Sequence, residues 1–183
     1  LLMDVTASPF PLIAEQQVLG PLNMVRSGYW QPLPEDLWQD AAAAHDAQGL
    51  LIKGRAHVYP ELAAAGLWTT PVDLAHFAIE LSRAWSGRSS LLMKLDTARR
   101  MLTPQGGGPT GLGVFLDGAG ATLRFRHPGD NLGYHALMVV YADGRFGAVV
   151  MTNGEGGRQL VAEVVNSIAR LEGWPEFTPL KAE

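Results

Sequence analysis

The chain has 183 residues, 47% of them hydrophobic, which is long enough for a full domain core. A formal net charge of −4, with no basic run, argues against a nucleic-acid-binding surface. With no cysteine, disulfides, a thiol nucleophile and a thiolate metal site are excluded. No apolar run approaches the ~20 residues that span a bilayer, so we expect no transmembrane segment. Because the chain does not begin with methionine, a removed leader stays open, and so do cytoplasmic, periplasmic and secreted locations.

The first part of the chain carries helix signals separated by loops. A helix is predicted over residues 9–19, since proline suits its first turn and a Gly-Pro pair follows it. Residues 27–34 should form a loop in which Tyr29 and Trp30 pack in the protein instead of stacking on a base. An alanine-rich composition predicts a second helix over residues 35–47.

The clearest helix signal begins at Thr70. Pro71 occupies the first helical position and Asp73 stands at the capping-box distance from Thr70. Apolar residues then recur on one face up to Gly87, and they are Leu74, Phe77, Ala78, Leu81 and Trp85.

Two further segments complete the part of the chain that precedes the strands. Ser90 is expected to cap a helix over residues 91–102. The glycine-rich residues 105–109 lack the Lys-Ser/Thr pair and helix start of a phosphate-binding loop, so they are interpreted as a hinge.

Four strands follow, and then one more helix. Strands are predicted over 111–116, 122–126, 136–142 and 146–151, and the last two form a hairpin through Asp143-Gly144. Neither hairpin strand alternates apolar with polar residues, so helices should cover both faces of the sheet. An apolar stripe predicts a helix over residues 158–171, followed by a loose tail at 176–183. This order of elements indicates an α+β fold.

Two sequence blocks carry a family resemblance. One is the strand that ends in His127-Pro128-Gly129, continues through Asn131-Leu132-Gly133-Tyr134, and leads to a hairpin ending in Thr152-Asn153. The other is the block Gly66-Leu67-Trp68-Thr69-Thr70-Pro71-Val72-Asp73-Leu74-Ala75 with the residues before it from Tyr59. Both, in this order and at this separation, resemble serine hydrolases related to β-lactamases and penicillin-binding proteins.

The resemblance implies a particular version of the α+β fold. The family has an antiparallel sheet covered by helices on both faces, together with a helical subdomain. On this basis residues 1–104 would belong to the helical subdomain and its connections, 105–175 to the last strands and final helix, and 176–183 to a tail. We expect the sheet in this chain to be incomplete, and the apolar central strands to be partly uncovered.

The resemblance also implies chemistry that these residues alone do not complete. In relatives a serine in Ser-x-x-Lys attacks an acyl carbon, and the lysine and a tyrosine handle protons. Neither Ser-x-x-Lys nor Tyr-x-Asn occurs in the 183 residues. We therefore expect an N-terminal portion of the same protein, or a second copy bound at the open sheet edge, as partner, and a small-molecule acyl substrate.

By resemblance, the cleft residues lie on the His-Pro-Gly strand. His127 would stand where many relatives carry lysine, Gly129 would let substrate approach, and the peptide N–H of Asp130 would donate in an oxyanion hole. Pro128, Asn131 and Tyr134 would contact substrate. His45, His57, His76 and His135 are interpreted as ordinary structural residues, and neither a metal site nor a cofactor is predicted.

Two function classes stay open at this point. The first is the C-terminal part of a serine hydrolase that forms an acyl-enzyme with an ester, amide or β-lactam and is inactive without its missing motifs. The second is a non-catalytic relative that has lost the nucleophile and kept the cleft for binding.

Overall fold

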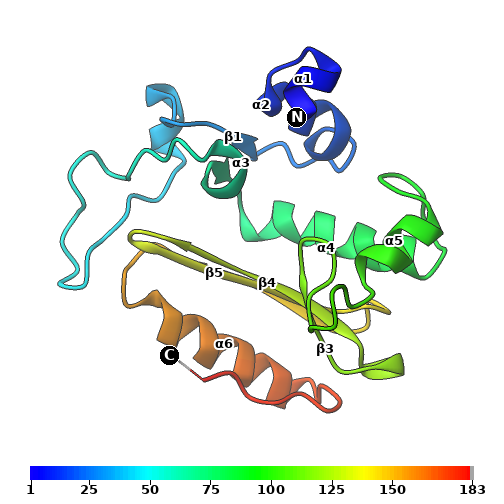
Figure 1. Ribbon diagram of the computed structural model, residues 1–183. Helices are drawn as coiled ribbons and strands as arrows, with labels where there is room; N and C mark the ends of the chain where they lie inside the picture. The colour runs from blue at the N-terminus through cyan, green and yellow to red at the C-terminus, as the bar shows by residue number, and fades with distance from the viewer. Residues whose placement is uncertain (182–183) are drawn as a thin grey trace.

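A computed structural model describes residues 1–181, and a four-stranded antiparallel sheet lies at its centre (Figure 1). The strand order is β3-β4-β5-β6, so each strand pairs with its neighbour in the chain. The strands are β3 (Phe115–Asp117), β4 (Arg124–Asn131), β5 (Tyr134–Tyr141) and β6 (Gly147–Thr152). The α+β class expected from the order of elements is confirmed.

Two tight turns set the register of the sheet. The predicted hairpin between β5 and β6 is confirmed, with Gly144 at a φ of 76° in its turn. Only two residues, Leu132 and Gly133, join β4 to β5, and Asn131 lies opposite Tyr134. Gly133 has a φ of 76°, and a Cβ there would lie 2.7 Å from the Cβ of Ala44. Glycine is therefore required at this tip for both conformation and space.

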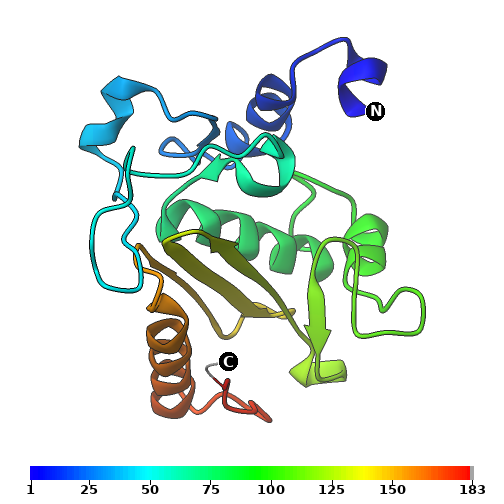
Figure 2. The same ribbon diagram turned by 60° about the vertical axis from the view of Figure 1, so that its left-hand side comes forward.

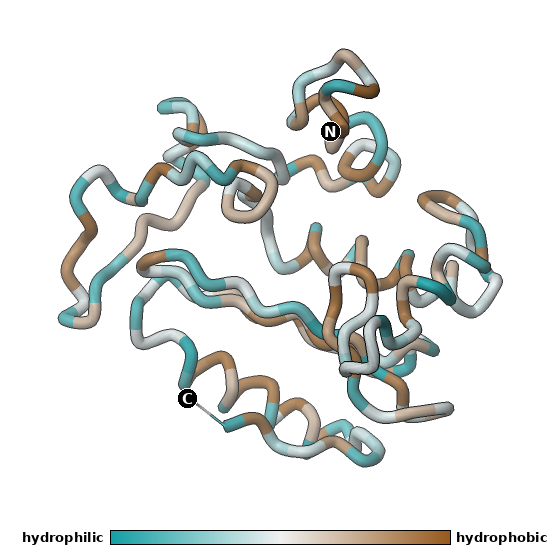
Figure 3. Tube along the Cα trace, viewed as in Figure 1, coloured by the Kyte–Doolittle hydropathy of each residue, from teal (hydrophilic) through white to brown (hydrophobic). Residues whose placement is uncertain are grey.

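Helices cover both faces of the sheet, as the apolar strands predicted (Figures 1 and 2). Helices α4 (Pro71–Trp85) and α5 (Leu95–Met101) pack on one face, and α6 (Gly157–Leu171) packs on the other. Side chains of β5 alternate between the two apolar clusters, with Met138 and Val140 toward α4 and Val139 and Tyr141 toward α6. Figure 3 shows hydrophobic residues along the sheet and on the turns of α6 nearest to it.

The expectation that the central strands would be uncovered is therefore wrong for their faces. What stays open is an edge, because β6 pairs with β5 alone among residues 1–181. The side chains of β6 are half-buried from Ala148 to Thr152. A pairing position is thus available along this strand.

Helix α4 begins as the sequence predicted. The hydroxyl of Thr70 accepts a hydrogen bond of 3.1 Å from the peptide N–H of Asp73. The buried Asp73 carboxylate in turn accepts from the Ser27 hydroxyl at 2.8 Å and from the peptide N–H of Arg26 at 2.9 Å. These hydrogen bonds fix residues 26 and 27 against the first turn of α4.

The N-terminal part matches one helix prediction and corrects another. The predicted helix at 9–19 is present as α2 (Phe10–Ala14) continued by a wider π-helical turn, η1 (Glu15–Leu19), and a short helix α1 (Leu2–Thr6) precedes it. The helix predicted over 35–47 is wrong beyond a 3-10 turn, η2 (Glu35–Gln39). Ala44 instead exchanges backbone hydrogen bonds with Arg55 and Ile52, so tertiary pairing overrides the helix propensity of the alanines.

Other boundaries also differ from prediction. Helix α5 begins four residues later than expected and Ser90 does not cap it, since the preceding residue is Lys94. The strand predicted over 111–116 is displaced to β3, because Gly111 and Val114 instead close a turn. A short helix α3 (Leu62–Ala65) and a two-stranded sheet of β1 (Gly28–Tyr29) and β2 (Leu67–Trp68) complete the fold.

The tail expected to be loose is packed as far as the structure describes it. The Asn166 side chain makes two hydrogen bonds to the backbone of Leu180, at 2.8 and 3.0 Å. Phe177 and Leu180 pack on the apolar cluster beneath α6. The last two residues of the predicted tail, 182 and 183, lie outside the described residues.

Candidate functional site

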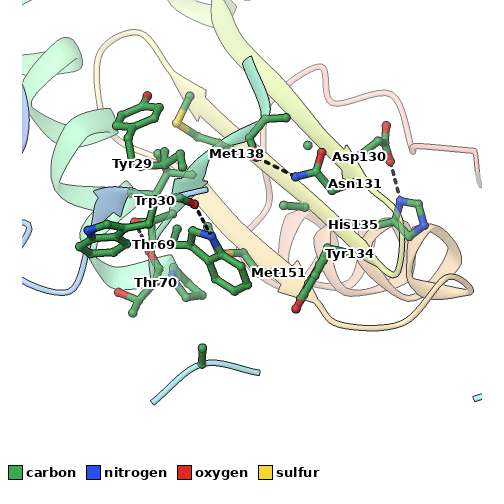
Figure 4. A pocket seen from close by; sticks show the side chains of 18 of the residues that line it. Tyr29, Trp30, Thr69, Thr70, Asp130, Asn131, Tyr134, His135, Met138 and Met151 are labelled. Atoms are coloured by element: carbon green, nitrogen blue, oxygen red, sulfur yellow. Dashed lines mark hydrogen bonds and ion pairs between the residues drawn. The ribbon is translucent and has the colours of Figure 1, made fainter. Parts of the chain in front are cut away.

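A cleft lies between the face of the sheet on which α4 packs and the segment that runs from Val25 to Phe77. Its volume is about 970 Å³. Every candidate residue from the sequence lines it, namely His127, Pro128, Gly129, Asp130, Asn131 and Tyr134. Figure 4 shows several of its lining side chains, contributed by the two sheets and by the segment before α4.

The His-Pro-Gly part of β4 has a free edge. Strand β3 pairs only with residues Arg124–Arg126, so among the described residues 127–131 have a partner on the β5 side alone. Strand β4 as a whole is thus not an edge strand, but its second half is. This half lies along the cleft.

Side chains along this half alternate between the two faces of the sheet. Phe125 packs toward α4, so His127, Gly129 and Asn131 share that face, which is the cleft side. By the same alternation the ring of Pro128 and the side chain of Asp130 lie on the α6 face. Pro128 was predicted to contact substrate, and this alternation turns its ring away from the face that carries His127 and Gly129.

The peptide N–H of Asp130 points out of the sheet edge. In an antiparallel pair, alternate residues of one strand bond to the partner, and residues two apart point their N–H groups the same way. Ala142 donates its N–H to the carbonyl of Leu123, so the hydrogen-bonded positions of β4 that follow in this register include 127, 129 and 131. The N–H of Asp130 is therefore directed away from β5, toward the cleft edge.

Gly129 is not required by the packing of the sheet. A Cβ built there would lie 3.4 Å from the Cβ of Ala136, an ordinary contact. Its lack of a side chain leaves the cleft side of the strand open beside the Asp130 N–H.

The His127 side chain is exposed, and one of its two ring nitrogens is engaged within the protein. Its Nδ1 lies 2.6 Å from the carbonyl oxygen of Pro128, which can only accept, so Nδ1 carries the proton. Nε2 then remains as the second polar atom of the ring. The Phe115 ring lies 6.3 Å from the imidazole, centroid to centroid.

The tip of the β4–β5 hairpin is held from several sides. The Asn131 side chain donates to the carbonyl of Ala65 at 3.0 Å, and the peptide N–H of Leu132 donates to the Tyr59 hydroxyl at 2.9 Å. Gly133 donates its N–H to the Glu155 carboxylate at 2.7 Å. The two sequence blocks that suggested the family thus meet here.

Tyr134 faces the cleft as a neutral phenol. Its hydroxyl donates to the carbonyl of Ala42 at 2.7 Å. Burial raises the pKa of Tyr134 to about 12. It therefore keeps its proton at neutral pH and does not act as a phenolate base.

His135 is a member of the site that sequence reasoning did not single out. It lies opposite Asp130 across the hairpin, and its Nδ1 is 2.5 Å from Asp130 Oδ1 (Figure 4). Its Nε2 lies 2.9 Å from the carbonyl of Glu155, and Arg158 contacts the same Asp130 oxygen at 3.3 Å. Both ring nitrogens of His135 are thus engaged by oxygen atoms of the protein. Because only Leu132 and Gly133 separate β4 from β5, a two-residue hairpin turn recognised in the sequence would have placed Asp130 opposite His135.

We predict that His135→Leu destabilises the protein by about 1–3 kcal/mol, because the buried His135 ring loses its hydrogen bonds to the Asp130 carboxylate and to the carbonyl of Glu155. Urea denaturation of variant and parent measures the change. His127→Leu is the matched control and should change the midpoint little, since that ring is exposed. Equal losses in the two variants would contradict the structural role of His135.

Three threonines line the cleft, and each hydroxyl is already engaged. Thr69 bonds to the Ser27 hydroxyl at 2.7 Å, Thr70 caps α4, and Thr152 donates to the carbonyl of His135 at 3.0 Å. None is hydrogen-bonded to a histidine or lysine side chain in the described part of the chain. The cleft therefore presents a candidate oxyanion donor without an activated nucleophile.

Neither a metal cluster nor a membrane helix is found in residues 1–181. No three histidine, aspartate or glutamate side chains there lie close enough together to hold a metal ion. No helix in the same range is both long and apolar enough to cross a bilayer.

Comparison with known proteins places this chain in a family. A family model described as Beta-lactamase matches residues 1–169. The chain belongs to the beta-lactamase family. No curated protein matches it.

Solved structures of beta-lactamase-like proteins share the fold. An octameric penicillin-binding protein homologue from Pyrococcus abyssi superposes with a TM-score of 0.72 at 20% identity, over 94% of this chain and 40% of that one. D-amino acid amidase from Ochrobactrum anthropi SV3 gives 0.60 at 17% identity, over 83% and 46%. D-alanine carboxypeptidase AmpC from Burkholderia cenocepacia gives 0.70 at 17% identity, over 93% and 57%.

The chain thus spans about half the length of these solved beta-lactamase-like structures. At such identities the likeness shows the fold, and it confirms the β-lactamase/transpeptidase-like architecture expected from the two sequence blocks.

Proposed function

We propose that this chain is the C-terminal part of a serine hydrolase that forms an acyl-enzyme with an ester, amide or β-lactam. The observation that carries the proposal is the free edge at Gly129 and Asp130, where an unpaired peptide N–H faces a cleft. A second support is that amidase and carboxypeptidase structures share this fold.

In the proposed reaction, the edge of β4 stabilises charge. A serine supplied by an N-terminal portion attacks the acyl carbon, and the carbonyl oxygen becomes an oxyanion. The N–H of Asp130 donates to that oxygen, and the N–H of the serine is the second donor. The proton of the serine hydroxyl passes through the lysine and tyrosine of the N-terminal portion to the leaving oxygen or nitrogen, whose bond to the acyl carbon breaks (in a β-lactam this nitrogen stays attached through the opened ring). Water then cleaves the acyl-enzyme and releases the acid and the free serine.

The side chains around this edge have separate proposed roles. His127 presents its imidazole to the leaving group or to a substrate carboxylate. Asn131 and Tyr134 contact the substrate from the same face of the sheet. The Asp130 carboxylate stays on the α6 face, where His135 and Arg158 offset its charge near the developing oxyanion.

The partner that we propose is an N-terminal portion with the Ser-x-x-Lys and tyrosine motifs. Strand β6 offers an unpaired edge for strands of such a portion, or for a second copy of the chain. The matched structures are about twice as long as this chain, which leaves room for that portion.

The test is covalent labelling of the protein translated together with the sequence that precedes Leu1. We expect intact-mass spectrometry to show an acyl adduct after incubation with a p-nitrophenyl ester or nitrocefin. Replacing the serine of Ser-x-x-Lys by alanine should abolish the adduct. Binding without any adduct would overturn the enzyme proposal and favour a binding module that has lost the nucleophile.

A further inference from the structure

One wall of the cleft is built from aromatic rings that pack edge to face. Trp68 of β2 lies 5.8 Å from Tyr134 of β5 and 5.5 Å from Trp38, with interplanar angles of 79° and 77°. We call Trp68 and Tyr134, both of which line the cleft, the aromatic wall. Trp38 supports it from behind, and the Arg55 guanidinium lies 4.4 Å from the Trp38 ring centroid. Rings packed in this way have fixed orientations.

The polar atoms of this aromatic wall are already used within the protein. Trp68 Nε1 donates to the carbonyl of Trp30 at 3.1 Å. The Tyr134 hydroxyl donates to the carbonyl of Ala42 at 2.7 Å. What the two rings offer to a ligand is therefore hydrocarbon surface.

The adjacent lining is apolar and polarisable. Met151 of β6 lines the cleft and is half-buried, whereas Met138 of β5, which also lines the cleft, is only 4% exposed and packs in the core against α4. Methionine sulfur makes favourable contacts with aromatic rings and adapts to the shape of a ligand. The two rings and the thioether of Met151 thus line the same cleft, and such a lining suits a flat apolar group.

Few charges in the cleft could hold an anion. Among the described residues, no lysine lines it, and Arg26 is its one arginine. The side chains of His135 and Arg158 are already engaged by the Asp130 carboxylate on the α6 face. A ligand carboxylate against the aromatic wall would lose hydration without gaining an ionic partner there.

We propose that the aromatic wall, together with Met151, is a subsite for an uncharged aromatic group of the substrate. The subsite rests on the proposed function only in taking its occupant to be part of an acyl compound. The subsite narrows the substrate class to neutral esters or amides that carry an aromatic group. Substrates with a carboxylate in place of that group would be disfavoured.

The test compares two probes with the same ring and chain length, neither of which can be hydrolysed. We expect 2-phenylethanol, which is neutral, to bind the complete protein at least about tenfold more tightly than phenylacetate, as measured by calorimetry at pH 7.5. Phenylacetate binding as tightly as the alcohol, or more tightly, would overturn the proposal.

Variants of the aromatic wall locate the binding. Tyr134→Leu and Trp68→Leu should each weaken 2-phenylethanol binding about tenfold, since each removes one ring contact. Tyr134→Phe and Trp68→Phe, which keep a ring, should recover most of that loss. Leu160→Ala, on the exposed side of α6, is the control and should leave the affinity unchanged. Unchanged binding in both leucine variants, with circular dichroism showing folded protein, would place the ligand elsewhere.

The calorimetric result is separable from the enzyme proposal. Binding of 2-phenylethanol without any acyl adduct would retain the subsite and reject the serine hydrolase. An adduct that forms only with anionic substrates would retain the hydrolase and reject the subsite.

Discussion

Asp130→Pro should lower the turnover of the complete protein about a hundredfold to a thousandfold relative to Asp130→Ala. Proline removes the peptide N–H that we propose as an oxyanion donor, and losing one such donor typically has an effect of this size. The sheet should tolerate the change, since this N–H points away from β5, as does the nitrogen of Pro128 two residues earlier.

The comparison with alanine isolates the N–H. Both variants lose the carboxylate that His135 and Arg158 hold, so effects of the side chain cancel in the ratio. The measurement is kcat/KM with a p-nitrophenyl ester, together with a thermal melt of each variant. Equal rates in two folded variants would show that Asp130 does not form the oxyanion hole.

The chain of 183 residues by itself should show no serine-dependent turnover of nitrocefin or of a p-nitrophenyl ester. The described part of the cleft holds no hydroxyl beside a base, and Ser-x-x-Lys does not occur in the sequence. Co-expression with the segment that precedes Leu1 should restore turnover. Restoration should fail when the serine of Ser-x-x-Lys in that segment is replaced by alanine.

The same preparation tests the open edge of the sheet. We expect the isolated chain to self-associate in size-exclusion chromatography, because β6 presents unpaired backbone groups along an apolar strand. Association should diminish when the upstream segment is present. Turnover by the chain alone, or a stable monomer with a cooperative melt, would show that the missing half has been placed wrongly.

Much of the fold could be predicted because the signals are local. Thr70, Pro71 and Asp73 lie within one helical turn, so the start of α4 follows from cap chemistry that neighbouring residues complete. Asp143-Gly144 sets the β5–β6 hairpin in the same way, since its turn needs a positive φ. Apolar runs without alternation likewise predicted that both faces of β5 are covered.

Predictions failed where distant residues compete for the same backbone. The alanines at 41–44 favour a helix, yet Ala44 pairs with Ile52 and Arg55. Ser90 resembles a helix cap, but α5 begins only after Lys94. For Ala44, the backbone hydrogen bonds to distant residues contribute more free energy than the small differences in local propensity.

For the site, the sequence alone determined which residues are candidates, through the His-Pro-Gly strand and the block before α4. Only the tertiary structure decided how they are presented. Pairing of β3 with half of β4 leaves residues 127–131 at a free edge, and the phase of the β4–β5 ladder turns the Asp130 N–H outward. Strand register likewise pairs Asp130 with His135, and chain folding brings Trp68 against Tyr134. The physical reason is that hydrogen-bond direction and ring packing depend on partners distant in sequence, which composition and spacing do not specify.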